Sequence, residues 1–293
     1  MFSFPIGVIL DSFRLPVRDA LAEAAKLGVQ GIQVYVTKGE LSPENMTAEK
    51  CSEFLDMVRS YGLAISALCG DLGQGFGDRE KNPSLIEKTK RIMDLARRLD
   101  TDIVTTHIGV IPEDRNHPRY QIMLEACGEL GRFAEDIGVR LAVETGPERA
   151  VALKRFLDEI SSHGMAVNMD PANFVMVTGD DPVQAVYTLG DYIVHTHAKD
   201  GRKLADKDPE VIYRIIEDEI QSGRSFVELP LGEGDVPFPA YLKALQDIGY
   251  KGFLTVEREV GENPAEDIAK AVLFLRNLSP GPKGDGYGHS KKP

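Results

Sequence analysis

Four short apolar runs of the chain end in side chains that can bind a metal ion. The runs cover residues 139–144, 165–170, 191–200 and 253–257, and the side chains toward their C-terminal ends are Glu144, Asp170, His197 and Glu257. In an extended strand, residues two apart share a face, so His195 and His197 point to the same side. If the runs are neighbouring parallel strands, the four side chains meet at one edge of a sheet. Three carboxylates and one imidazole at one point predict a divalent-metal site.

The ligand types favour a hard cation. Because three of the four ligands are carboxylates, we expect one divalent ion, with Mn²⁺ in first place and Mg²⁺, Co²⁺ or Zn²⁺ as alternatives. The two glutamates also predict a reaction. Moving a proton next to a carbonyl group requires a base near the carbon and a Lewis acid that holds the oxygen of the enediolate. Glu144 and Glu257 on opposite faces of a planar enediolate are therefore the candidate catalytic acid and base.

Three reactions share this first step. Return of the proton on the other face is epimerisation, return at the adjacent carbon is isomerisation, and loss of hydroxide is dehydration. The residue pattern leaves the three open. The structural alternative for the glutamates is an ion pair with Arg140 or Arg258, although neighbouring residues of a strand face opposite sides.

Further polar residues near the strand ends are candidate substrate contacts. His107 ends the fourth expected strand, Asn173 follows Asp170, and the charged candidates are Glu148, Lys199 and Arg202. For the charged residues, plain solvation is the alternative. His195 lies one layer deeper than His197, so it is either a core histidine with satisfied hydrogen bonds or a support for the ligands.

The rest of the chain provides strands and helices in alternation. The expected strands are Ile6–Leu10, Gly31–Tyr35, Ala64–Leu68, Ile103–His107, Arg140–Glu144, Ala166–Asp170, Ile193–His197 and Phe253–Glu257. Helix-period apolar patterns lie between them and commonly end in a glycine, as at Gly28, Gly62, Gly138, Gly164, Gly190 and Gly249. Eight strand-helix units predict an α/β fold of the (β/α)₈ barrel type, in which the chemistry lies at the C-terminal strand ends. A doubly wound sheet is the alternative, but no Gly-x-Gly-x-x-Gly turn follows the first strand.

Length and composition limit the classes of function. The 293 residues are 42% hydrophobic and 27% charged, which is typical of a globular chain with a large core, and we expect one domain over residues 1–278. The formal charge of −12 argues against a nucleic-acid-binding surface. Cys51, Cys69 and Cys127 show neither paired nor metal-binding spacing, which indicates buried, reduced thiols. With no membrane-spanning or signal-like run, we expect a cytoplasmic protein that does not bind membranes.

Two loops on the expected catalytic side are long. Residues 69–77 are rich in glycine and are interpreted as a mobile lid, a backbone cradle for phosphate, or a plain flexible loop. Residues 202–229 carry a helical pattern at Val211, Ile212, Ile215, Ile216 and Ile220, which could cover the site or contact another subunit in a homo-oligomer. The tail 279–293 is rich in Gly, Lys and Pro and is expected to be disordered.

Taken together, five motifs resemble the sugar phosphate isomerase/epimerase group of the xylose isomerase-like TIM barrels. They are Val-Glu144-Thr-Gly-Pro-Glu, Asn-Met-Asp170-Pro-Ala-Asn, His195-Thr-His197-Ala-Lys-Asp, Pro-Leu-Gly-Glu-Gly-Asp235-Val and Gly249-Tyr-Lys-Gly-Phe-Leu-Thr-Val-Glu257. The resemblance extends to about Leu278. It implies that the four ligand candidates bind the metal and that Glu144 and Glu257 are the acid/base pair. The group includes ketose 3-epimerases, hydroxypyruvate isomerases, inosose dehydratases and, more distantly, endonuclease IV.

The sequence departs from the motifs of this group at two positions, and both departures reduce the number of activities that fit the chain. Epimerases and endonuclease IV usually have a histidine where this chain has Asn173, and the trinuclear nuclease needs Asp-x-His where this chain has Asp235-Val-Pro237. We therefore expect a metal-dependent isomerase or epimerase of a small sugar, ketose or polyol. An inosose-type dehydratase is the first alternative, and an endonuclease IV-like hydrolase or a noncatalytic sugar-binding barrel is less favoured.

Overall fold

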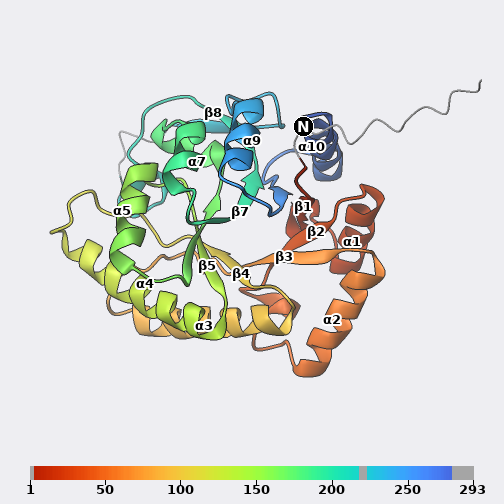
Figure 1. Ribbon diagram of the computed structural model, residues 1–293, viewed down its shortest axis with the longest axis horizontal. Coiled ribbons are helices and arrows are strands. Elements are labelled where there is room, and N and C mark those ends of the chain that lie inside the picture. Colours follow the sequence, from red (N-terminus) through yellow and green to blue (C-terminus); the bar gives the residue numbers. More distant parts are fainter. Residues whose placement is uncertain (1–2, 218–222, 279–293) are drawn as a thin grey trace, which may run out of the picture.

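Eight of the apolar runs form the parallel strands of a closed barrel, which the helices surround (Figure 1). The computed structural model describes residues 3–217 and 223–278. The strands are β1 (Ile6–Ile9), β2 (Gly31–Tyr35), β3 (Ala64–Cys69), β4 (Ile103–Thr106), β5 (Arg140–Glu144), β6 (Met165–Met169), β7 (Ile193–Ala198) and β10 (Leu254–Val256). The barrel closes where β1 pairs with β10. The fold is therefore the predicted TIM barrel, and the alternative prediction of an open doubly wound sheet is wrong.

One long helix follows each barrel strand and packs its apolar face against the outside of the barrel. These helices are α1 (Val17–Lys26), α2 (Ala48–Ser60), α3 (Asn82–Arg98), α4 (Pro118–Ile137), α5 (Ala150–Ile160), α7 (Pro182–Leu189), α9 (Phe238–Asp247) and α10 (Pro264–Leu278). Asp181 caps α7 by accepting hydrogen bonds from two backbone N–H groups, and a proline occupies the start of the helix after it. The helices thus bury the outer face of the sheet.

The glycine pattern is confirmed at four of its six positions, where φ is positive: Gly28, Gly62, Gly138 and Gly249. Gly164 has a different role. A Cβ at this position would lie 2.0 Å from the carbonyl oxygen of Gly131, so Gly164 allows β6 to start directly against α4. Gly190 has helical dihedral angles. Close packing, rather than a left-handed turn, therefore explains Gly164.

A layer of polar side chains lies inside the barrel. It consists of Gln33, Thr105, Asn168, His195 and Thr255, all at most 1% exposed. They belong to β2, β4, β6, β7 and β10. Buried polar groups need hydrogen-bond partners, and these residues find them in each other. This layer lies beneath the strand-end residues and supports them.

A two-stranded hairpin follows β7 and interrupts the regular alternation. It pairs β8 (Asp200–Lys203) with β9 (Phe226–Leu229) in antiparallel register. The helix predicted between them is confined to α8 (Pro209–Ile212), which Asp208 caps. Ile215 and Ile216 follow it as exposed, non-helical residues, so the prediction of a longer helix is wrong. Ile220 and the tail 279–293 lie outside the described residues.

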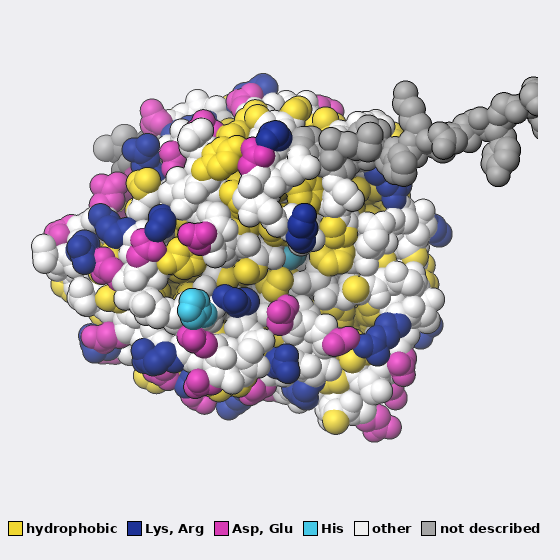
Figure 2. All heavy atoms as spheres, viewed as in Figure 1, with side chains coloured by type: hydrophobic (Ala, Val, Ile, Leu, Met, Phe, Trp, Pro, Cys, Tyr) yellow, Lys and Arg dark blue, Asp and Glu magenta, His cyan; other side chains and the backbone are white. Residues whose placement is uncertain are grey.

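The surface carries charges of both signs. On the face in Figure 2, basic and acidic side chains are interspersed. Within residues 3–217 and 223–278, no helix combines the length and apolar character needed to cross a membrane. The three cysteines are buried and unpaired, as predicted.

Candidate metal centre

The barrel brings the four predicted ligands together at the C-terminal ends of its strands. One ligand atom from each of Glu144, Asp170, His197 and Glu257 lies within 4.8 Å of the other three, and all four residues are buried. The Nδ1 atom of His197 is 3.1 Å from Glu257 Oε2, 3.6 Å from Glu144 Oε1 and 3.7 Å from Asp170 Oδ2. Among the described residues, this is the cluster whose donor atoms could hold a metal ion.

The donor atoms fit a small divalent cation. Asp170 Oδ1 accepts hydrogen bonds from the backbone N–H groups of Ala172 and Asn173, whereas its buried Oδ2 has no hydrogen-bond partner. Glu257 Oε2 is likewise buried without a hydrogen bond. A buried, unpaired carboxylate oxygen is costly unless a cation compensates it. Bonds of about 2.0–2.1 Å place opposite ligands roughly 4 Å apart, a span that these four atoms match.

The polar layer orients the ligands from below. Gln33 Oε1 lies 3.1 Å from His197 Nε2, and because an amide oxygen only accepts, Nε2 must donate and Nδ1 remains for a metal. Gln33 is in turn held by a hydrogen bond from its Nε2 to Thr105 Oγ1. His195 donates from Nδ1 to Asn168 Oδ1 and accepts at Nε2 from Thr255 Oγ1. His195 is thus a buried histidine with satisfied hydrogen bonds.

Lys199 compensates part of the negative charge. Its Nζ lies 3.2 Å from Glu257 Oε2 and 2.8 Å from Glu259 Oε2. Burial opposes the charge of Lys199, but the carboxylates of Glu257 and Asp170 outweigh it and raise its pKa well above the ordinary value. Burial likewise disfavours ionised Glu257, yet Lys199 and His197 lower the pKa of that carboxyl. Both groups are therefore charged at neutral pH.

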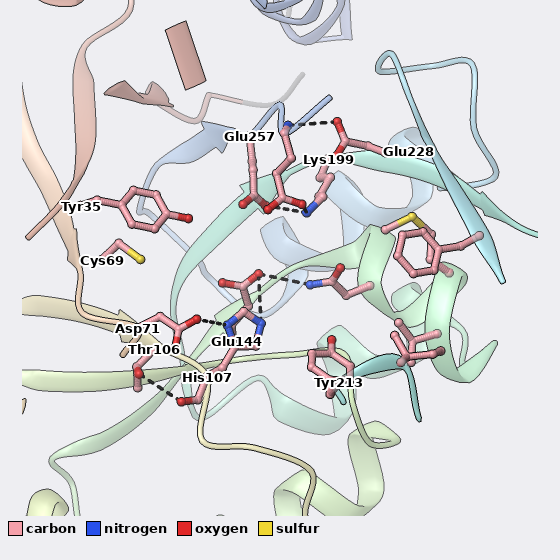
Figure 3. A pocket seen from close by; sticks show the side chains of 16 residues that line it. Tyr35, Cys69, Asp71, Thr106, His107, Glu144, Lys199, Tyr213, Glu228 and Glu257 are labelled. Carbon is pink, nitrogen blue, oxygen red and sulfur yellow. Dashed lines mark hydrogen bonds and ion pairs between the residues drawn. The ribbon is translucent and has the colours of Figure 1, made fainter. Parts of the chain in front are cut away.

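His107 forms a second link to the ligands (Figure 3). Its Nδ1 is 3.2 Å from Asp71 Oδ2, and its Nε2 is 3.8 Å from Glu144 Oε1. Burial disfavours the imidazolium, but Glu144 and Asp71 prevail and raise the pKa of His107 to about 9. The same contacts lower the pKa of Glu144, because the effect of burial on this carboxyl is outweighed by the charges of His107 and His197. Asp170 has a raised pKa because burial dominates there.

A cavity of about 280 Å³ opens above the ligands. Of the predicted substrate contacts, His107, Asn173 and Lys199 line it. The Asn173 amide donates to Glu144 Oε1 and to the carbonyl of Thr145. The arginines considered as partners of the glutamates bind elsewhere: Arg258 pairs with Glu228 and Asp267, and Arg140 donates to the carbonyl of His163.

Two predicted contacts lie outside this cavity. Glu148 lines a neighbouring cavity of about 530 Å³ on the other side of α8. Arg202 pairs with Asp235 at 3.0 Å, and both side chains are half exposed. We therefore assign neither residue to the centre.

Sequence reasoning missed several lining residues: Tyr35, Asp71, Tyr213, Phe226, Glu228 and Glu259. Tyr35 ends β2, and Asp71 follows β3 within two residues, so the strand-end rule that found the ligands could have found both. Tyr213, Phe226 and Glu228 come from the hairpin after β7, and no local pattern indicates which of its side chains turn inward.

Comparisons with known proteins agree with the barrel fold. Fructoselysine 3-epimerase of Escherichia coli O157:H7 is 24% identical over 260 residues, which cover 83% of this chain and 86% of the relative. Inosose dehydratase of Clostridium perfringens strain 13 is 24% identical over 167 residues, or 55% of each chain. The crystal structure of a xylose isomerase domain protein from Planctomyces limnophilus has a TM-score of 0.77 and 27% identity, covering 94% of this chain and 96% of the other.

The family model that matches this chain describes a xylose isomerase-like TIM barrel and spans residues 21–278. This range includes the four ligand candidates and the lining residues of the cavity. The chain belongs to the xylose isomerase-like TIM barrel family.

Proposed function

We propose that this chain is a divalent-metal-dependent isomerase or epimerase of a sugar, ketose or related polyol that works through an enediolate intermediate. The observation that carries the proposal is the pair of buried glutamates Glu144 and Glu257. They approach the same nitrogen of His197 from β5 and β10, which lie on opposite sides of β7 in the barrel. Both carboxyls have lowered pKa values, so each is ionised near neutral pH and can accept a proton.

The side chains divide the proposed reaction between them. A bound divalent ion would supply a Lewis acid for the substrate oxygens. Glu144, Asp170, His197 and Glu257 would hold it. One glutamate would take the proton from the carbon beside the carbonyl, and the other glutamate, once it has taken a proton from solvent, would return it on the opposite face; the first glutamate then releases its proton to solvent.

Two neighbouring side chains position these groups. The Lys199 ammonium holds Glu257 in place through their ion pair, and the Asn173 amide holds Glu144 through its hydrogen bond. For the metal, the oxygen-rich ligand set favours Mn²⁺, with Mg²⁺, Co²⁺ or Zn²⁺ as alternatives.

Dehydration is the second candidate, because of His107. With a pKa of about 9, this imidazole is protonated at neutral pH, and it lies 3.8 Å from Glu144. A protonated group beside the base can donate to a departing hydroxide. The match to inosose dehydratase supports the same reaction. Nuclease activity has less support, because Asp235 pairs with Arg202 instead of joining a second metal cluster among the described residues.

The experiment is turnover in D₂O. The Mn²⁺-loaded protein is incubated with a panel of ketoses, ketose phosphates and inososes, and proton NMR follows the carbon beside the carbonyl. We expect deuterium to enter this position in at least one substrate. Conversion without deuterium would indicate a direct hydride shift, binding without conversion would indicate a sugar-binding protein, and phosphodiester cleavage would indicate a nuclease. Each of these outcomes contradicts the proposal.

A further inference from the structure

The charges around the cavity select the class of substrate. We infer that the part of the substrate held above the ligands carries no anionic group, so that the substrate is an unphosphorylated ketose or polyol and a cationic substituent is tolerated better than a phosphate. This inference rests on the proposed function and specifies its substrate.

Carboxylates dominate the cavity. Besides the buried ligand Asp170, the lining contains five acidic side chains: Asp71, Glu144, Glu228, Glu257 and Glu259. The cationic lining residues in the described part of the chain are His107 and Lys199. Six carboxylates thus face at most two lining cations and Arg258, which pairs with Glu228, so a divalent ion would raise the positive charges to five at most. The site keeps a net negative charge even when it is loaded.

Neither cation is available to a phosphate. Lys199 contacts Glu257 at 3.2 Å and Glu259 at 2.8 Å, while His107 contacts Asp71 at 3.2 Å and Glu144 at 3.8 Å. A phosphate would have to compete with two carboxylates for each cation. Phosphate recognition relies on Arg or Lys whose charge is free to pair with it. The nearby Arg258 does not serve, because Glu228 and Asp267 already hold its guanidinium.

The glycine-rich loop does not supply a phosphate cradle either. Its contribution to the cavity beyond β3 is the carboxylate of Asp71, whose Oδ1 accepts the N–H of Gly73. The N–H of Phe76 is bonded to the carbonyl of Ile108, and Gly75 packs against Gly109. An anion nest needs free N–H groups that point at the ligand. In this loop the carboxylate of Asp71 accepts the N–H group of Gly73 that a bound phosphate would otherwise accept.

The opposite wall of the cavity is apolar. It consists of Met176, Val177, Ile212 and Phe226, with the ring of Tyr213 beside them. Such a wall suits the C–H groups of a sugar or polyol and offers no charge to an anion. The ionised wall with the ligands can bind hydroxyl groups, since carboxylates accept and Lys199 donates hydrogen bonds. The two walls together match an uncharged polyhydroxy compound.

The test uses matched pairs that differ only in the phosphate. Deuterium exchange is measured with the Mn²⁺-loaded protein on D-fructose and D-fructose 6-phosphate, and on D-ribulose and D-ribulose 5-phosphate. We expect kcat/KM for the free ketose to exceed that for its ester by about tenfold or more, the factor of one uncompensated charge contact. An ester that exchanges as fast as its parent ketose overturns the inference and leaves the proposed function standing.

Binding decides the inference if no substrate exchanges. That result would contradict the proposed function alone. Calorimetry then compares ribitol, ribitol 5-phosphate and 1-amino-1-deoxyribitol on the loaded protein. The inference predicts that the phosphate binds weakest of the three. A phosphate that binds as tightly as ribitol overturns it.

A pair of variants separates the charge of the cavity from that of the whole protein. Glu259→Gln removes a lining carboxylate and releases Lys199 from one partner, so the ratio of kcat/KM for ester over ketose should rise about two- to fivefold. Glu262→Gln makes the same change at an exposed position outside the cavity, and the ratio should stay constant. Equal ratios in the two variants would show that the lining charge does not select the substrate.

Discussion

The two walls of the cavity are held in place in different ways. The ligand wall comes from the ends of β5, β6, β7 and β10, and its side chains are supported from below by the polar layer inside the barrel. The apolar wall, called the hairpin wall below, comes from the hairpin β8–β9, from α8 and from residues 174–178, which carry Met176 and Val177; all of these lie outside the barrel. The hairpin is anchored by the buried carboxylate of Asp200, which accepts backbone N–H groups of Gly201, Gly232, Gly234 and Val236.

Because of this difference, we expect the ligand wall to carry out the reaction and the hairpin wall to influence which substrate binds. A closed barrel holds its strand ends rigidly, so the ligand wall can position a proton-transferring pair to within a fraction of an ångström. The hairpin depends on a few anchoring contacts and can change its side chains without disturbing the barrel. We therefore expect substitutions in the ligand wall to affect turnover and metal binding, and substitutions in the hairpin wall to affect substrate choice or little at all.

The largest effect should come from Glu257→Gln in the ligand wall. Gln keeps the shape and one ligand oxygen but cannot accept a proton, so kcat should fall by roughly 10²–10⁴-fold while metal affinity falls only in part. Deuterium exchange and calorimetric metal titration measure the two effects. Glu262→Gln serves as the control and should retain full turnover. A Glu257→Gln protein that turns over at more than a tenth of the original rate would remove this residue from the catalytic pair.

The second-largest effect should come from the polar layer that supports the ligands, and it should appear in metal affinity. Gln33→Ala removes the acceptor that orients the His197 imidazole, and the loss of such a partner typically weakens metal binding by about ten- to a hundredfold. Gln30→Ala, just before β2 at the other end of the barrel, should leave metal affinity unchanged. Calorimetric titration with Mn²⁺ compares the two. If both variants bind alike, the polar layer does not orient His197.

The ligand wall was predictable from the sequence, and the hairpin wall was not. A strand of period two with an acidic end is a local pattern, and the strand ends of a parallel barrel meet by topology, so Glu144 and His197 follow from a few residues each. No local sequence pattern predicts the role of Gln33, because that role depends on a contact with His197, which lies 164 positions further along the chain. The helical period over residues 211–216 is misleading, because Ile212 lines the cavity whereas Ile215 and Ile216 are exposed.

Glu148 lies outside both walls, in the neighbouring cavity behind α8, and should affect stability rather than turnover. Burial raises its pKa to about 8, so the folded protein keeps a proton that the unfolded chain loses near the ordinary carboxyl value. Stability from this group is therefore full below about pH 4.5 and is lost as the pH rises through about 8. Between pH 6 and 8 the free energy of unfolding should fall by about 2 kcal/mol more in the parent protein than in Glu148→Gln.

Urea unfolding of the metal-free proteins at the two pH values measures this difference. Gln is uncharged throughout, so all other titrating groups cancel in the comparison. Parallel pH profiles of the two proteins would mean that Glu148 is already ionised at pH 6. The barrel and the hairpin would then meet around a solvated carboxylate.

The smallest effect should come from Arg202→Ala on β8 of the hairpin. Arg202 and Asp235 form an ion pair at 3.0 Å in which both side chains are half exposed, and such pairs contribute roughly 0–1 kcal/mol. Because the guanidinium lies outside the cavity lining, kcat/KM should change by no more than about twofold, with a similarly small change in urea stability. Lys199→Ala is the contrasting variant, since it removes the cation that holds Glu257. A loss of tenfold or more in kcat/KM for Arg202→Ala, at unchanged stability, would mean that the hairpin turns this guanidinium onto the substrate, and the division between a reactive barrel wall and a passive hairpin wall would fail.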